Sequence, residues 1–321
     1  MPRPLLHETF GLTYRKIPIL SIGREIYCDT SLIIEALEHY FPASAGWGTV
    51  YPKCDGVEEW VYRGLARGFA NLWVDKPLFR TTTGLIPPSV WKTPFGTDRA
   101  ALIGHPLDPV KLARKIPENL SILDSHLSML EPMLSSGTWA IPTKSPSLAD
   151  ISLFYQLRWA MDISAGKGIY NLTGGATDDV GEDVMGRVFS KERYPGTWNW
   201  FHTLEEYLSS LPDRETRVDG SSPASLAELL GKYELWGDGD VLVPTPNGES
   251  ESLDVQRGLK AGVMVSVAPD DTGRDFPTVG ELVKIGVEEV VIKPVEKAEV
   301  DCRIHFPRMG FVVKVVEGSR L

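Results

Sequence analysis

The sequence predicts an α+β protein of several domains, with a helical region between two regions of short strands. Apolar residues recur at helical spacing from about residue 51 to 212, and β-branched runs bounded by turn residues precede and follow that stretch. A chain of 321 residues with 42% hydrophobic content is long enough for more than one core. We therefore expect three domains, at residues 1–42, 51–218 and 222–321.

Composition and charge narrow the class of protein. The net charge is −10, and an acidic chain without a basic stripe disfavours nucleic acid and anionic membrane surfaces as partners. No apolar run approaches the length of a membrane span, and the opening MPRPLLHETF lacks the apolar segment of a secretory signal. Three scattered cysteines suit a reducing compartment. We expect a cytoplasmic protein.

The first region is predicted to be a hairpin followed by a helix. Ile17–Ile22 and Glu25–Cys28 are apolar, β-branched runs, and Gly23 between them can supply a turn with positive φ. The Asp-Thr-Ser segment at 29–31 offers N-cap side chains. Apolar residues then recur at helical spacing over 32–40, so a helix is expected there.

Four long helices are expected in the second region, because apolar residues recur three and four positions apart. They span about 55–78, 108–134, 147–161 and 198–211. The third is apolar on nearly all sides, as expected of a buried central helix. The glycine-rich stretch 165–186 lacks the spacing of a phosphate-binding loop, so we expect a long surface loop.

The third region follows a polar linker rich in Gly, Ser and Pro. Its short β-like runs, from DVLVP to GFVVKVV, are evenly spaced and predict a small antiparallel barrel or sandwich. The acidic turn at 268–273 lacks the later ligands of a calcium loop, so a plain hairpin turn is expected.

A candidate ligand site lies where the first region's strand and helix begin. A cis bond between Ile17 and Pro18 would leave the backbone N–H and C=O of Ile17 free for an extended ligand. The first N–H groups of the helix and the Thr30 hydroxyl favour an anion, and Lys16 adds a positive charge. These residues would hold a short peptide with two carboxylates. A plain hairpin and capped helix is the alternative.

The same residues resemble the glutathione-binding half of the thioredoxin-like domain of cytosolic glutathione transferases. The string KIPIL is similar to the family's strand with its cis proline, here Pro18, and the following DT pair is similar to its acidic–hydroxyl pair. The resemblance implies that Asp29 and Thr30 bind the γ-glutamyl group of glutathione. It also implies that Ile17 pairs with the cysteinyl residue and that Lys16 approaches the glycyl carboxylate.

A second motif supports the resemblance. Residues 147–150, Ser-Leu-Ala-Asp, resemble the box that begins the central helix of the family's all-helical domain. Ser147 would be the N-cap, and Asp150 would reach back from N3 to the Ser147 N–H, which is a structural role. The likeness spans about residues 11 to 212. GREIYCDTSLIIEALE is similar to fungal members, some of which carry a β-rich C-terminal extension, and the third region would be such an accessory domain.

The chain departs from the family at its start. In the family, two strands and a helix precede this point and carry the Tyr, Ser or Cys that activates the glutathione thiol, whereas only MPRPLLHETFGLT stands here. One alternative is a shortened version of a longer protein, which would leave residues 17–20 as an uncovered sheet edge. The other alternative is that a residue elsewhere in the chain activates the glutathione thiol. Tyr14, His7 and Arg15 lie near the site in the sequence. Cys28 is expected to be buried and inert.

The second substrate would be bound by the helical domain. Trp60, Arg63 and Arg67 lie on the first long helix, which faces the cleft in the family, and Trp159 lies at the end of the central helix. These aromatic and cationic residues suit a large, partly polar electrophile. Core packing is the alternative for each of them.

The resemblance implies glutathione as co-substrate and attack of its thiolate on an electrophilic small molecule. The product would be a conjugate or, after reversible addition to a double bond, a cis–trans isomer, in detoxification or secondary metabolism. The resemblance also implies a homodimer. A non-catalytic glutathione-fold binding protein is the main alternative, and a redox enzyme working through its own cysteine is another.

Overall fold

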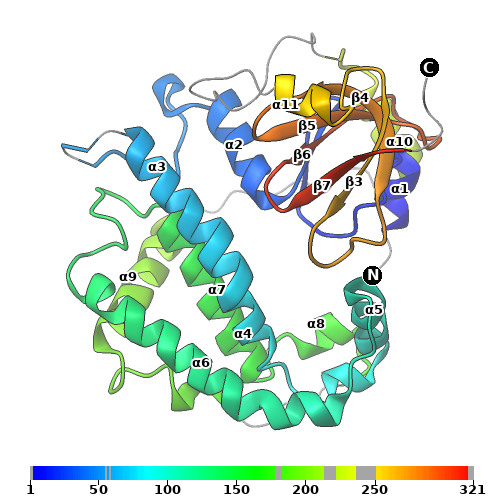
Figure 1. Cartoon of the computed structure of the whole chain (residues 1–321). Coiled ribbons are helices and arrows are strands. Elements are labelled where there is room, and N and C mark those ends of the chain that lie inside the picture. The colour runs from blue at the N-terminus through cyan, green and yellow to red at the C-terminus, as the bar shows by residue number, and fades with distance from the viewer. Residues whose placement is uncertain are drawn as a thin grey trace. The chain divides into compact units, whose positions relative to one another are not determined.

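The computed structural model describes residues 3–54, 56–57, 59–177, 183–212, 222–235 and 251–316. The chain divides into two compact units (Figure 1). The first comprises Met1–Gly48, Leu102–Gly104 and Thr216–Leu321, and the second comprises Thr49–Ala101 and His105–Glu215. The expected strand DVLVP and most of the polar linker lie outside the described residues.

The first unit is built on a single mixed sheet. Within the described part of the chain this sheet has seven strands in the order β1-β2-β6-β5-β4-β3-β7. The strands are β1 (Ile19–Ile22), β2 (Glu25–Cys28), β3 (Met264–Pro269), β4 (Thr278–Ile285), β5 (Glu289–Pro294), β6 (Arg303–Pro307) and β7 (Phe311–Val315). Neighbouring strands are antiparallel except β2 and β6, which are parallel.

The prediction of a separate barrel or sandwich at 222–321 is wrong, because the C-terminal strands belong to this sheet. Its strands continue the N-terminal hairpin, and the junction pairs Ile26 of β2 with Ile304 of β6. A strand edge offers backbone N–H and C=O groups whatever its side chains, so the local pattern does not say which distant segment will satisfy them. As a result, the expected segments 1–42 and 222–321 belong to one unit rather than two domains.

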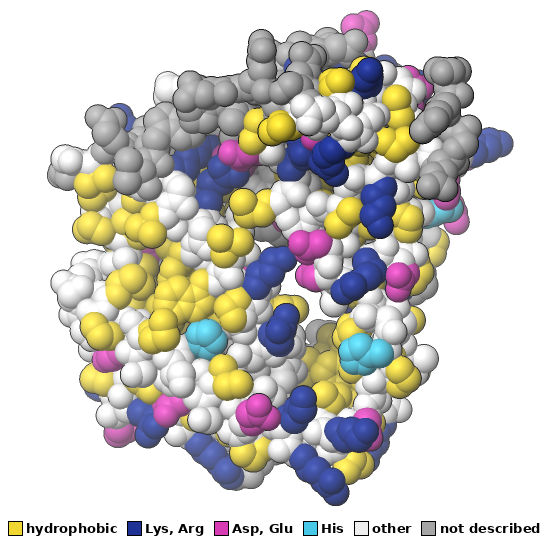
Figure 2. All heavy atoms as spheres, viewed as in Figure 1, with side chains coloured by type: hydrophobic (Ala, Val, Ile, Leu, Met, Phe, Trp, Pro, Cys, Tyr) yellow, Lys and Arg dark blue, Asp and Glu magenta, His cyan; other side chains and the backbone are white. Residues whose placement is uncertain are grey.

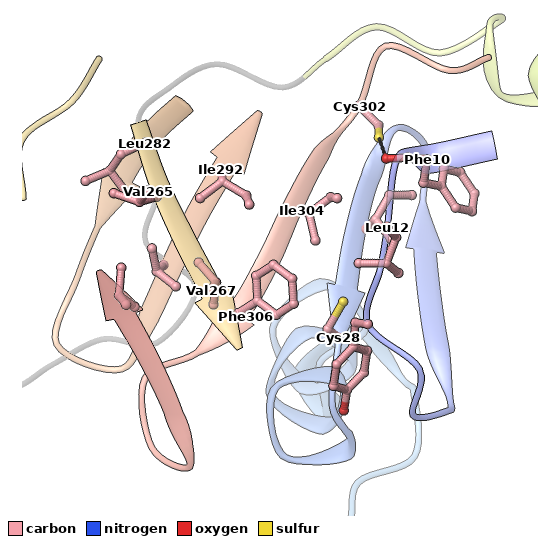
Figure 3. Packing of buried hydrophobic residues seen from close by; sticks show 14 of the residues in the cluster. Phe10, Leu12, Cys28, Val265, Val267, Leu282, Ile292, Cys302, Ile304 and Phe306 are labelled. Atoms are coloured by element: carbon pink, nitrogen blue, oxygen red, sulfur yellow. Dashed lines mark hydrogen bonds between the residues drawn. The ribbon is translucent and has the colours of Figure 1, made fainter. Parts of the chain in front are cut away.

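The sheet has an apolar layer on each face. On one face, residues of β2 and β6 pack with Phe10 and Leu230, which come from helices α1 (Pro4–Phe10) and α10 (Pro223–Leu230). Figure 3 shows N-terminal and C-terminal side chains meeting in this cluster, with the Cys302 thiol 3.8 Å from the Phe10 carbonyl oxygen. On the other face, Tyr27 packs against helix α2 (Thr30–Tyr40). The alternation follows from the period of two along a strand.

The N-terminal residues form part of this core. Helix α1 has a proline in its first turn and ends at Gly11, whose φ of 65° lies in the left-handed region. Leu12 and Tyr14 are then buried with Phe10. Among the described residues, β1 pairs only with β2, so no described strand covers its outer edge.

A buried ionic network ties three strands of the sheet together. The imidazole of His305 lies between two carboxylates, with Nδ1 2.6 Å from Glu289 Oε1 and Nε2 2.8 Å from Glu25 Oε2. The Tyr27 ring packs on the imidazole with a centroid separation of 4.3 Å. Burial disfavours the charged imidazole, but the hydrogen bonds to both carboxylates outweigh it and raise the pKa of His305.

The second unit is helical. A helical run begins with α3 (Glu59–Gly68), continues as the π-helix η2 (Phe69–Leu78) and ends as α4 (Phe79–Thr83). The other long helices are α5 (Pro94–Ile103), α6 (Pro109–Ser135), α7 (Leu148–Ser164) and α9 (Pro195–Ser210). The short elements of the chain are η1 (Ala43–Ala45), η3 (Val90–Lys92), α8 (Ile169–Thr173), η4 (Met185–Arg187) and α11 (Glu251–Gln256). The expected loop at 165–186 therefore contains the short helix α8 and the start of η4, and its residues 178–182 are outside the described part.

The central helix α7 begins with the capping box that the sequence predicts. Asp150 Oδ2 accepts hydrogen bonds from the Ser147 N–H at 2.9 Å and from the Ser147 hydroxyl at 2.7 Å. Its Oδ1 accepts from the Ala140 N–H at 2.6 Å and from the indole N–H of Trp200, on α9, at 2.9 Å. Asp150 is fully buried. The motif thus also joins α9 and the segment before α7 to the start of the central helix.

Two surface properties bear on the class of protein. Acidic and basic side chains are interspersed on the face shown in Figure 2. Within the residues that the structure describes, none of the helices is both long enough and apolar enough to cross a membrane.

Candidate functional site

The candidate site lies in the first unit, at the edge strand and the start of α2. The bond between Ile17 and Pro18 is cis, as the sequence predicts. Ile17 is 60% exposed, and no hydrogen bond from the described residues reaches its backbone. Strand β1 starts only two residues later, at Ile19. The backbone of Ile17 is therefore available to pair with an extended ligand.

Asp29 adopts a rare backbone conformation between β2 and α2. Its φ of 73° and ψ of 135° make it the one described non-glycine residue with positive φ. Such a conformation costs about 1–3 kcal/mol and is typical of functional sites. The carboxylate caps the helix, since Oδ1 accepts from the Ser31 N–H at 3.0 Å and from the Ser31 hydroxyl at 2.6 Å. Oδ2 points toward Tyr14.

The first turn of α2 leaves two donors for a ligand. The N–H groups of Leu32 and Ile33 donate to the Asp29 carbonyl oxygen at 3.1 and 2.9 Å. Thr30 is exposed, and neither its N–H nor its hydroxyl has a partner among the described residues. These two donors lie at the positive end of a helix of 11 residues, where a carboxylate is stabilised.

Tyr14 lies beside the Asp29 carboxylate. Its hydroxyl is 3.5 Å from Asp29 Oδ2, and its ring is buried. Burial first, and then the charge of Asp29, raises the pKa of Tyr14, so the phenol keeps its proton and remains a hydrogen-bond donor. The other two candidates for thiol activation contact the C-terminal segment. His7 is 2.5 Å from Glu296, and the Arg15 guanidinium lies over the Phe276 ring.

Lys16 already has an anionic partner within the chain. Its Nζ is 2.7 Å from Oδ1 of Asp271, in the turn between β3 and β4. The two side chains are 29% and 45% exposed. The cation that the sequence assigns to a ligand carboxylate is therefore paired with a carboxylate from the C-terminal segment.

Cys28 is fully buried, and burial raises the pKa of its thiol well above the usual value. A thiol in this environment stays protonated and is a poor nucleophile. The expectation that Cys28 is inert is therefore supported by its environment.

Two of the expected substrate residues, Arg63 and Trp159, pack against aromatic rings of their own unit. The Arg63 guanidinium lies 4.4 Å from the Tyr51 ring centroid, and Arg67 is half-buried. Trp159 stacks on Phe79 with a centroid separation of 6.3 Å and packs at the rim of a small apolar cluster. The side chain of Trp60 lies outside the described part of α3. A substrate role for these four residues remains a prediction.

Comparisons with known proteins address the fold. A protein-family model described as a domain of unknown function (DUF7962) matches residues 82–172. A solved structure titled as a GST-like protein from Pseudomonas syringae is 26% identical, with a TM-score of 0.55, and the alignment covers 98% of this chain and 87% of that one. The chain has a glutathione-transferase-like fold. The alignment is long enough to span the C-terminal strands as well.

A more distant structure was also found. The tau-class glutathione S-transferase from mango, Mangifera indica, is 14% identical with a TM-score of 0.36, over 72% of this chain and 82% of that one. This likeness is too weak to support any argument. No curated protein matches the sequence.

The glutathione-transferase-like fold brings together part of the predicted site and adds one residue to it. Ile17 precedes β1, and Asp29 and Thr30 follow β2, so all three lie at the end of the hairpin where Ile19 pairs with Cys28. That they bind a ligand stays a prediction. Asp271 was missed as a site residue, because the acidic pair at 270–271 was interpreted as a turn. A pair of acidic residues in a sequence does not indicate which distant side chain it will contact. Asp271 meets Lys16 because the β2–β6 junction joins the N-terminal hairpin to the C-terminal strands.

Proposed function

We propose that the first unit binds glutathione and that the protein adds its thiolate to an electrophilic small molecule. The observation that carries the proposal is the start of α2, where the Thr30 N–H and hydroxyl, which have no partner among the described residues, lie next to the Asp29 carboxylate. The γ-glutamyl end of glutathione carries one ammonium and one carboxylate. Asp29 can accept from the ammonium, while Thr30 can donate to the carboxylate.

Two further observations support this ligand. The exposed Ile17 backbone can form strand-like hydrogen bonds with the cysteinyl residue of an extended tripeptide. The glutathione-transferase-like fold extends over nearly the whole chain, so the similarity is not limited to the short sequence motif.

Catalysis requires a donor to the glutathione sulfur, and we assign Tyr14 to this role. Its hydroxyl lies beside Asp29 and keeps its proton. A free thiol titrates near about 8.5, and a hydrogen bond that favours the thiolate by about two pKa units is worth roughly 2.7 kcal/mol. Tyr14→Phe should then lower turnover while leaving glutathione affinity largely unchanged.

The proposal also includes the contacts of the electrophile, the compartment and the oligomeric state. We place an electrophile against the second unit, with Trp60, Arg63, Arg67 and Trp159 as its candidate contacts. Conjugation and glutathione-dependent cis–trans isomerisation both use this arrangement, in detoxification or in secondary metabolism. All three cysteines are free, which agrees with a reducing compartment such as the cytoplasm. A homodimer is part of the proposal.

The test is calorimetric titration with glutathione and with S-hexyl-glutathione. A hydrogen bond to a charged group contributes about 1.5–3 kcal/mol, so Thr30→Ala should weaken binding about tenfold or more. Thr30→Ser is the matched control, because it keeps the hydroxyl and should bind nearly as the parent does. Equal affinity for the parent and the alanine variant would contradict the site.

The alternative is a glutathione-fold binding protein without catalysis, in which Tyr14 lies beside Asp29 but activates no thiol. Assays with electrophiles separate the two functions. Binding of glutathione without turnover of any electrophile would support the binding protein, whereas turnover that Tyr14→Phe abolishes would support the enzyme.

A further inference from the structure

We infer that Asp271 makes this site prefer γ-glutamyl-cysteinyl thiols whose C-terminal end carries no negative charge. The inference rests on the proposed function, since it concerns the ligand of that same site. It starts from the contact between Lys16 and Asp271, in which Nζ and Oδ1 are 2.7 Å apart.

The turn that carries Asp271 is attached to the segment before the site. The Thr13 hydroxyl lies 2.9 Å from the Thr278 hydroxyl, and the Arg15 guanidinium lies 4.8 Å from the Phe276 ring centroid. Within the turn, Arg274 Nε donates to the Asp271 carbonyl oxygen at 3.0 Å. These contacts hold the Asp271 carboxylate beside Lys16 before any ligand arrives.

The charges around the site then disfavour a third anion. Asp29 and Asp271 are both close enough to Tyr14 for their negative charges to act on its hydroxyl. Lys16 is the cation in direct contact with Asp271, at 2.7 Å, so its positive charge is already balanced by that carboxylate. The γ-glutamyl end of a ligand is neutral overall, because it carries one ammonium and one carboxylate, so it meets no net repulsion.

The glycyl end of glutathione, in contrast, carries a carboxylate without a neighbouring ammonium, so it adds a net negative charge. To reach Lys16 it must either displace Asp271, which then loses its partner, or stay beside it as a like charge. A carboxamide in the same place keeps the shape of the ligand and can accept a hydrogen bond from Lys16 without adding charge. The structure therefore predicts that neutralising the glycyl end improves binding.

The experiment compares glutathione with its glycyl carboxamide by calorimetric titration of the full chain. Because half-exposed ion pairs are worth at most about 1 kcal/mol, the parent should bind the amide about threefold to fivefold more tightly than glutathione. Asp271→Asn should remove this preference by tightening glutathione binding, with little change for the amide. Asp275→Asn is the matched control, since it makes the same charge change in the same turn and should keep the preference.

The outcomes separate this inference from the proposed function. Tighter binding of glutathione than of the amide, or an unchanged ratio in Asp271→Asn, would overturn the role of Asp271 while leaving glutathione binding in place. No heat from either ligand, with parent and variant both folded by circular dichroism, would overturn the proposed function and this inference with it.

Discussion

The Asp150→Ala substitution should strongly destabilise the helical unit. The Asp150 carboxylate is fully buried and accepts four hydrogen bonds, two from Ser147, one from Ala140 and one from Trp200. These donors come from the start of α7, the segment before it and α9. Removing the carboxylate therefore affects three segments at once.

The magnitude follows from the donors that lose their acceptor. Three of them are N–H groups with fixed directions, while the Ser147 hydroxyl can rotate toward another acceptor. A buried N–H without an acceptor costs about 1–2 kcal/mol, so we expect a loss of roughly 3–6 kcal/mol. A typical domain has only about 5–15 kcal/mol of stability, so much of the helical unit's stability would be lost.

Urea unfolding followed by circular dichroism and tryptophan fluorescence would measure this loss. Asp150→Asn is the matched variant, because it keeps one acceptor oxygen for two of the donors, and it should lie between the parent and Asp150→Ala. Trp200→Phe keeps an aromatic ring but removes the indole donor. Combined with Asp150→Ala it should cost about 1–2 kcal/mol less than the sum of the single changes.

Two results would refute the reasoning. One is a free energy of unfolding for Asp150→Ala within about 1 kcal/mol of the parent value. Losing one capping interaction and leaving one buried donor unsatisfied should together cost more than that. The other is strict additivity of Asp150→Ala and Trp200→Phe, which would show that the indole N–H does not depend on this carboxylate.

Two further predictions concern the sheet of the first unit. Because the pKa of His305 is raised in the folded state, the protonated imidazole contributes to the free energy of unfolding. This contribution is complete below the unfolded-state pKa, about 6.5, and is lost as pH rises through the folded-state pKa. Chemical unfolding over a pH series would measure this loss of stability, and the His305→Gln variant should not show it. Gly280→Ala would place a Cβ 2.5 Å from the Lys293 carbonyl oxygen and should cost about 1–3 kcal/mol in thermal unfolding, whereas Gly48→Ala, with nothing within 4 Å, should be nearly neutral. Equal stability of the two alanine variants would contradict the packing argument.

Local features of the sequence predicted local structure well. Strand β2, the capping box of α7 and the long helix α6 follow from side-chain periodicity and N-cap residues, which act within one or two turns of the chain. Strand β1, in contrast, begins at Ile19 and not at the expected Ile17. The cis bond at Pro18 is the one that the resemblance implies, because the family's strand carries a cis proline.

The arrangement of the sheet could not be predicted in the same way. The pairing of Ile26 with Ile304 depends on backbone groups that every strand possesses, so the six β-like runs of the third region seemed sufficient for a domain of their own. The same limit applies to Lys16, because its interaction with Asp271 exists only once that sheet has formed.

The parallel junction between β2 and β6 also fixes when this protein can fold. The hairpin is synthesised before the second unit, but the strand that completes its inner edge is synthesised only after that unit. Contacts of such high sequence separation fold slowly and leave strand edges exposed while the chain grows. The nascent hairpin therefore has to keep this edge unpaired, or be shielded by other factors, until the second unit and β6 have been translated.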